Sequence, residues 1–225
     1  SGVRISIIDL NKELVYSDSV PYLYSFKNPD SWIKSCEKLL DSIPAEVKSK
    51  LNKLAISGTS GTLIASNLKG EPMGKAIPYD QACNENKILL ESLTSGEDHL
   101  QTPYSSLAKA LNLIDKYGTN ILLRHQSDWI TGWFLKDWTY GEEGNNLKLG
   151  WDIKKGSWPI SFLNTSWQKC LPEIIKSGKI IGQVNSDLAK RLNLNKKLIL
   201  ISGTTDSNAS LIAASLGKED GLTVL

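Results

Sequence analysis

The chain has 225 residues, with 26 lysines and arginines against 24 aspartates and glutamates, so its formal net charge is +2. Hydrophobic residues make up 40% and charged residues 22%, which is typical of a folded globular protein and excludes a disordered chain. The weak charge and the lack of a cluster of basic and aromatic residues give no support for nucleic-acid binding. Because no apolar run approaches roughly 20 residues, we expect neither a membrane helix nor a signal peptide.

Cysteine usage indicates a reducing compartment. Cys36, Cys83 and Cys170 are odd in number and widely spaced, which argues against a disulfide framework. With two histidines and no Cys-x-x-C motif, a structural zinc site is not expected. We therefore predict a cytoplasmic protein without metal ligands among its side chains.

Strand and helix patterns alternate along the chain. Apolar spacing predicts strands at 3–9, 13–20, 54–56, 63–65, 75–79, 120–124 and 197–201. It predicts helices from 29 to the proline at 44, and at 45–51, 86–93, 105–116, 127–135, 171–175, 186–192 and 207–216. The stretch 139–156 is rich in glycine, asparagine and charge, and we expect an exposed loop there. The alternation indicates one α/β domain over 1–225, with a mixed sheet flanked by helices because the opening hairpin adds antiparallel strands.

Two polar turns that contain glycine follow predicted strands, at 57–62 and 202–206. They begin with the same tetrad, Ile56-Ser57-Gly58-Thr59 and Ile201-Ser202-Gly203-Thr204. Open α/β sheets bind ligands beyond the carboxyl ends of their strands, where glycine allows close approach and hydroxyls supply hydrogen bonds. The second turn precedes a helix, whose unpaired N–H groups would favour an anion. The first is not a Walker loop, because no Lys-Ser/Thr follows its glycines.

Asp206 is the residue of this pattern that could carry chemistry. A carboxylate at a strand end could accept a hydroxyl proton, as the base of a phosphoryl-transfer enzyme does. The residues alone favour a different role, in which Asp206 is the N-cap of the following helix. The two roles are compatible, since a helix N-terminus keeps a carboxylate ionised.

Other candidates have structural explanations beside the functional ones. Asp80 could contact a polar ligand, but aspartate is also common in turns. His125 lies near Asp128 in sequence, as a general base would, yet no nucleophile is close and a structural histidine is favoured. Trp129 and Trp133 have the spacing of a core-facing helix stripe rather than of a sugar-stacking pair.

Short motifs follow one another along nearly the whole chain in an order that is fairly specific. They are Ser1-Gly2-Val3-Arg4-Ile5, the stretch 56–62, Pro78-Tyr79-Asp80, Asp128-Trp129-Ile130, the stretch 145–150, Trp158-Pro159, the stretches 171–173 and 180–182, and Gly203-Thr204-Thr205-Asp206-Ser207. In this succession the chain resembles the N-terminal domain of the FGGY carbohydrate kinase family. The pentulose kinases that act on ribulose or xylulose are the most similar branch.

The resemblance implies a ribonuclease H-like fold of the actin-like ATPase type and phosphorylation of a small sugar by ATP with Mg²⁺. Asp206 would be the general base that takes the proton of the terminal sugar hydroxyl. Ser60 and Asp80 would hold sugar hydroxyls. The nucleotide phosphates would be contacted by Thr204, Thr205 and Ser1.

The chain departs from the family pattern at three places. The acidic residue and Gly-Thr expected before Ser1 are absent, the second phosphate motif would begin only at Leu225, and Gln81-Ala82-Cys83 replaces an expected arginine. We therefore expect a sugar-binding domain that has little kinase activity without the C-terminal nucleotide-binding domain of its parent. The alternatives are a non-catalytic carbohydrate-binding or regulatory module of the same fold, and a kinase for glycerol or another polyol.

Overall fold

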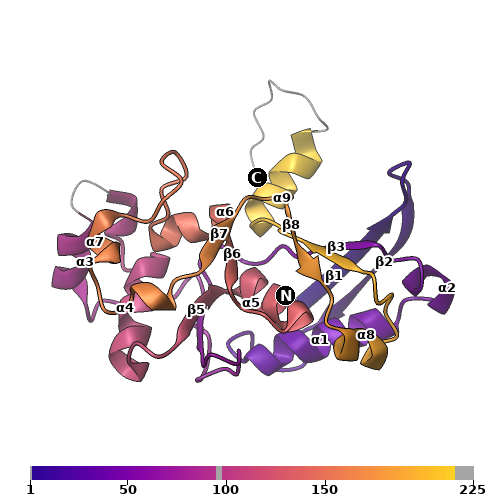
Figure 1. The fold of residues 1–225 in the computed structure, drawn as a ribbon, viewed down its shortest axis with the longest axis horizontal. Helices are drawn as coiled ribbons and strands as arrows, with labels where there is room; N and C mark the ends of the chain where they lie inside the picture. The colour runs from indigo at the N-terminus through magenta and orange to yellow at the C-terminus, as the bar shows by residue number, and fades with distance from the viewer. Residues whose placement is uncertain (1, 95–97, 216–225) are drawn as a thin grey trace.

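The computed structural model describes residues 2–94 and 98–215 (Figure 1). Its strands are β1 (Gly2–Ile8), β2 (Leu14–Pro21), β3 (Lys53–Ala55), β4 (Leu63–Ser66), β5 (Leu122–His125), β6 (Tyr140–Glu142), β7 (Glu173–Ile175), β8 (Ile180–Gln183) and β9 (Ile199–Ile201). Its α-helices are α1 (Pro29–Asp41), α2 (Ala45–Lys48), α3 (Lys87–Leu93), α4 (Ser106–Tyr117), α5 (Gln126–Leu135), α6 (Glu143–Asn146), α7 (Ile160–Leu163), α8 (Ser186–Arg191) and α9 (Asp206–Ser215). Short 3₁₀ turns lie at Asp98–Leu100, Leu147–Leu149 and Gln168–Cys170.

Both parallel and antiparallel strand pairs occur, as expected, but they are divided among short sheets. In the described residues, β1 and β2 form an antiparallel hairpin, and β3, β9 and β8 form a three-stranded sheet in that order. Within that sheet β3 runs parallel to β9, while β8 is antiparallel to it. The pair β4–β5 is antiparallel, and β6–β7 is parallel.

The buried apolar residues form two clusters, which correspond to the two halves of the elongated molecule in Figure 1. In the first, Trp32 of α1 packs edge-on against Trp129 of α5, with ring centroids 5.8 Å apart. Trp133 lies in the same cluster, which confirms the core-facing stripe predicted from its spacing. The second cluster surrounds Leu107 and Leu111 of α4.

Three segments differ from the sequence-based expectation. The stretch 139–156 is an exposed loop only in its last part: residues 153–156 are exposed, whereas the first part contains β6 and α6, and its polar residues Glu142 and Asn146 are buried. The predicted helix at 171–175 is instead β7, because pairing with β6 overrides local preference. The predicted strand at 75–79 makes one bridge, between Ile77 and Leu63, and does not extend into a strand.

The ends of β3 and β9 approach each other closely. A Cβ atom at Gly203 would overlap the carbonyl oxygen of Ile56 and lie 2.6 Å from its carbonyl carbon. The two identical tetrads, which are far apart in sequence, therefore lie side by side beyond two adjacent parallel strands. Glycine at 203 allows this contact because it has no Cβ.

We expect Gly203→Ala to lower the free energy of unfolding by about 1–3 kcal/mol, because the clash is with backbone that cannot rotate away. Gly182→Ala, on the neighbouring strand β8, is the matched control. Its added methyl would meet only the end of the Leu135 side chain, at 3.1 Å. Urea denaturation of both variants measures the difference, and equal losses would contradict the close approach.

Candidate functional site

The two polar turns meet at one edge of the β3–β9–β8 sheet. Gly58 and Thr205 form a parallel bridge, and the amide of Asp206 donates to the carbonyl oxygen of Gly58 at 3.0 Å. The first turn continues from Gly58 to Ser60, which is half-buried. Sequence analysis placed each turn at a strand end, and the structure brings the two into direct contact.

Asp206 is the first residue of α9 and is exposed. One of its carboxylate oxygens, Oδ1, accepts a hydrogen bond from the amide of Ser207 at 2.8 Å. The N-cap is Thr205, whose hydroxyl accepts from the amide of Asn208 at 3.1 Å. The prediction that Asp206 caps the helix is therefore wrong by one residue. Thr205 is the N-cap, because it forms the bridge with Gly58 and α9 begins at the next residue.

The first-turn amides of α9 all have partners within the protein. The amide of Asp206 donates to Gly58, that of Ser207 to Asp206, and those of Asn208 and Ala209 to the Thr205 hydroxyl and carbonyl. This turn offers no unpaired N–H group to an anion, contrary to the expectation from sequence. Hydrogen bonding between neighbouring residues has already satisfied these donors.

Two of the residues predicted to contact phosphates, Thr204 and Thr205, accept hydrogen bonds from Asn208 through their hydroxyl oxygens. The Thr205 hydroxyl is engaged in capping α9. The Thr204 hydroxyl is half-buried and accepts from the side-chain amide of Asn208 at 3.2 Å. Ser1 lies outside the described residues.

The two residues predicted to contact sugar lie on neighbouring turns. Gly61, which follows Ser60, has the left-handed φ of +80°. A Cβ atom built on Gly61 would lie 3.7 Å from the Cβ of Tyr79, the residue before Asp80. Asp80 itself is exposed. Gln126, the first residue of α5, contacts the first turn: its side-chain oxygen accepts from the amide of Thr59 at 3.1 Å.

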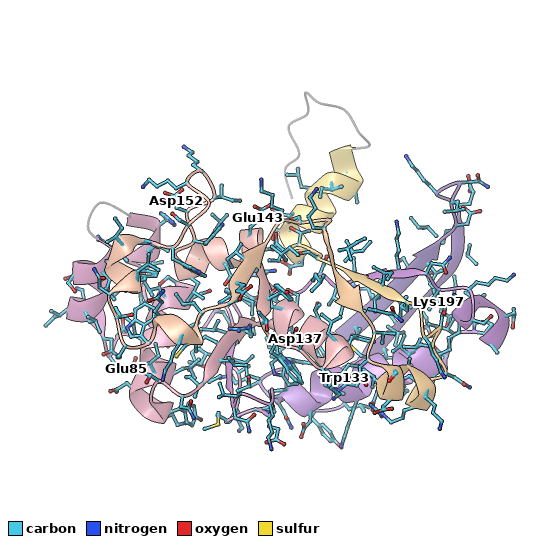
Figure 2. All side chains as sticks on the ribbon, in the orientation of Figure 1. Glu85, Trp133, Asp137, Glu143, Asp152 and Lys197 are labelled. Atoms are coloured by element: carbon cyan, nitrogen blue, oxygen red, sulfur yellow. The ribbon has the colours of Figure 1, made fainter. Side chains whose placement is uncertain are left out.

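A buried polar network lies behind these turns, and sequence analysis did not anticipate it. Glu142 accepts from the amides of Gly144 and Asn145, each at 2.8 Å, and so caps α6. The side-chain amide of Asn145 donates to Ser127 and to Glu142, each at 3.0 Å. A Cβ atom on Gly144 would lie 3.3 Å from the side-chain nitrogen of Asn208, so this network reaches α9. Figure 2 shows Glu143, the first residue of α6, beside the base of α9.

Asp128 belongs to this network and is buried. It accepts from the amide of Glu142 at 3.1 Å and from the side chain of Asn146 at 3.2 Å. Burial, assisted by the nearby Glu142 carboxylate, raises the pKa of Asp128 to about 7. The cavity that it lines with Glu142 and Ser202 has a volume of about 10 Å³, the size of one water molecule, and cannot admit a sugar.

His125 is buried and has the structural role that sequence analysis favoured. Its Nε2 lies 2.9 Å from the Ser106 hydroxyl, and its Nδ1 lies 3.8 Å from a carboxylate oxygen of Asp128. The order serine, histidine, aspartate is that of a hydrolase triad, but all three residues are buried and no substrate could reach them. Burial lowers the pKa of His125 to about 3, so the ring is neutral at physiological pH.

Residues 2–94 and 98–215 contain neither a cluster of metal ligands nor a membrane-spanning helix. No group of three or more histidine, cysteine, aspartate or glutamate side chains there could hold a metal ion. None of the helices in this part of the chain has both the length and the apolar character needed to cross a membrane.

No family model matches the sequence. Solved structures match the fold over nearly the whole chain, at 16% identity. They include xylulose kinase from Rhodospirillum rubrum (TM-score 0.80, 95% of this chain and 49% of that one) and ligand-bound xylulose kinase from Lactobacillus acidophilus (0.79, 95% and 48%). Glycerol kinase from Plasmodium falciparum with ADP also matches (TM-score 0.78, 96% and 48%, 16% identity). The chain spans about half the length of these proteins, and the predicted ribonuclease H-like, actin-like α/β fold is confirmed.

We expect His125→Gln to remove an acid sensitivity of the fold. In the unfolded chain the histidine pKa is about 6.5, so lowering the pH to 5 protonates it there but not in the folded protein. This difference destabilises the wild type by about 2 kcal/mol between pH 7.5 and pH 5. Asp128 acts in the opposite direction, because its raised pKa gives stability that is lost as the pH rises through 7.

Urea denaturation at pH 7.5 and 5.0 measures this effect, and subtracting the variant from the wild type cancels the Asp128 contribution. His99→Gln is the control, because His99 is exposed. A His125→Gln protein with the same pH dependence as the wild type would show that His125 is not held neutral.

Proposed function

We propose that residues 1–225 form the sugar-binding domain of an ATP-dependent sugar kinase whose acceptor is a pentulose, ribulose or xylulose. One observation carries the proposal. Asp206 presents an exposed carboxylate at the carboxyl end of β9, and its amide is bonded to the turn that leads to Ser60. The fold shared with the xylulose and glycerol kinases supports it.

The proposed chemistry is proton removal from an alcohol during phosphoryl transfer. The Asp206 carboxylate accepts the proton of a terminal sugar hydroxyl while that oxygen bonds to the γ-phosphorus of ATP. The bond from the γ-phosphorus to the bridging oxygen breaks, and ADP leaves. General base catalysis of this kind contributes about 10²- to 10⁴-fold in rate, and positioning of the reactants supplies much of the rest.

Ser60 and Asp80 are the proposed sugar ligands. Their turns adjoin, and a hydroxyl together with an exposed carboxylate offers both donor and acceptor to a sugar. On the phosphate side we propose the hydroxyls of Thr204 and Thr205, together with Ser1 on the strength of the family resemblance. Thr205 supports Asp206 by capping α9, and because its hydroxyl only accepts in that bond, its O–H can still donate to a phosphate.

Nucleotide binding is assigned to a second, C-terminal domain of the full-length protein. The described side chains form no cage for a metal ion, and the α9 first turn has no free amide. The groups proposed to meet magnesium-bound ATP are the Asp206 carboxylate and the hydroxyls of Thr204, Thr205 and Ser1. Magnesium, when bound with the nucleotide, neutralises charge on the phosphates. The three free cysteines favour a cytoplasmic location.

Glycerol or another polyol is the second candidate acceptor, because a glycerol kinase shares this fold over 96% of the chain. A non-catalytic module that binds carbohydrate without turnover is the third possibility. A coupled assay of ADP release by the full-length protein with ribulose, xylulose and glycerol separates the three. We expect turnover with a pentulose above that with glycerol, and failure with all three would overturn the kinase assignment.

We expect Asp206→Asn in the full-length protein to lower the sugar-dependent rate by about 10²- to 10⁴-fold, because the amide cannot accept the hydroxyl proton. The matched control is Asp187→Asn, since Asp187 is an exposed carboxylate in the first turn of α8. The control variant should keep the wild-type rate. An Asp206→Asn enzyme that retains most of its rate would remove Asp206 from the role of base.

A further inference from the structure

Lys109 lies within α4, and its side chain is completely buried, with 0% exposure. Its ammonium donates to three main-chain carbonyl oxygens, those of Gly61 at 2.8 Å, Tyr104 at 3.0 Å and Tyr79 at 3.1 Å. An ammonium has three N–H donors and no acceptor. These three bonds therefore use its whole hydrogen-bonding capacity.

The three carbonyls belong to segments that are separated in sequence. Gly61 lies 48 residues from Lys109 in sequence, Tyr79 lies 30 residues away and Tyr104 lies 5 residues away. Gly61 directly follows Ser60, and Tyr79 directly precedes Asp80. Tyr79 and Tyr104 are each about half exposed. Their side chains reach the surface, while their carbonyl oxygens accept from Lys109. Lys109 thus connects, through main-chain atoms, the two turns that carry the proposed sugar ligands.

A buried ammonium at this position is costly, and packing alone does not explain it. Burial disfavours the charged form and lowers the pKa of Lys109 to about 8. An apolar side chain of similar length would avoid this desolvation, but it would leave three carbonyl oxygens without their donor. The reason for a charged residue at this position is that the Lys109 ammonium links three loops through their carbonyl oxygens.

We infer that Lys109 is a positioning residue of the proposed sugar site, in which its three hydrogen bonds hold the Ser60–Gly61 turn and the Tyr79–Asp80 turn at a fixed separation. The inference rests on the proposed function. One acceptor molecule would have to meet Ser60 and Asp80 together, so a change in their separation weakens its binding and orientation. Lys109 does not bind the sugar itself, because all three of its N–H groups are engaged.

Lys109→Met in the full-length protein removes the three donors and keeps the length of the side chain. We expect the KM for sugar to rise by about 10-fold or more, with the KM for ATP within twofold of the wild type. Lys109→Gln, which keeps some donor capacity, should show the same selective effect to a smaller degree. Lys116→Met is the matched control, because Lys116 is exposed near the end of the same helix, and it should change neither constant.

Hydrogen exchange gives a second readout that requires no catalysis. The amides of Thr62 and Gln81 close the two turns, donating to Thr59 and Pro78 at 3.4 and 3.1 Å. Both should exchange about 10-fold faster in Lys109→Met, with the amides of α8 unchanged.

The outcomes separate this inference from the proposed function. An unchanged sugar KM in both variants, a parallel rise in both KM values, or unchanged exchange at the two turns would overturn the role of Lys109. If the wild type phosphorylates no sugar, the proposed function fails, and the sugar-site role of Lys109 fails with it. An active wild type whose Lys109 variants behave normally refutes the inference alone.

Discussion

The parallel pairing of β3 with β9 is the constraint on which the candidate site depends. It brings two distant copies of one tetrad side by side, and the contact between Gly203 and Ile56 leaves no room for a side chain between them. The bond from the Asp206 amide to the Gly58 carbonyl then fixes where α9 begins. Because that start is fixed, main-chain geometry places Asp206 at the edge of the sheet, and its carboxylate accepts from the amide of the next residue, Ser207.

Buried polar groups lie behind this edge, and burial shifts the pKa of three of them, His125, Asp128 and Lys109. Desolvation disfavours charge at His125 and at Asp128, so their pKa values move in opposite directions. Lys109 is also destabilised as a cation, but it is surrounded by three carbonyl acceptors. Of these buried residues, Lys109 and Asp128 hydrogen-bond to main-chain atoms of neighbouring segments, while the carboxylates of Asp80 and Asp206 are exposed.

The arrangement divides the proposed reaction between two parts of a protein. This chain presents an exposed carboxylate at Asp206 and the two turns proposed to bind sugar, while the first-turn amides of α9 have partners within the protein. Phosphoryl transfer needs little covalent chemistry from the protein and depends on bringing two substrates together in line. The chain spans about half the length of the xylulose kinases whose fold it shares.

The sequence by itself determined the α/β class, most of the helices, the two polar turns and the tryptophan stripe, because local periodicity and turn chemistry report these directly. It also singled out Asp206, but it assigned the N-cap of α9 to Asp206 instead of Thr205. The choice between the two depends on the bridge from Thr205 to Gly58, which local sequence does not show. Only the tertiary structure decided that Glu142 and Asn146 are buried, that 173–175 is a strand, and that Lys109 joins three loops. In each case the decisive partner is distant in sequence: β7 pairs with β6, and Lys109 bonds to Gly61, 48 residues away. Local sequence cannot encode such a contact, because its energy exists only once the chain has folded.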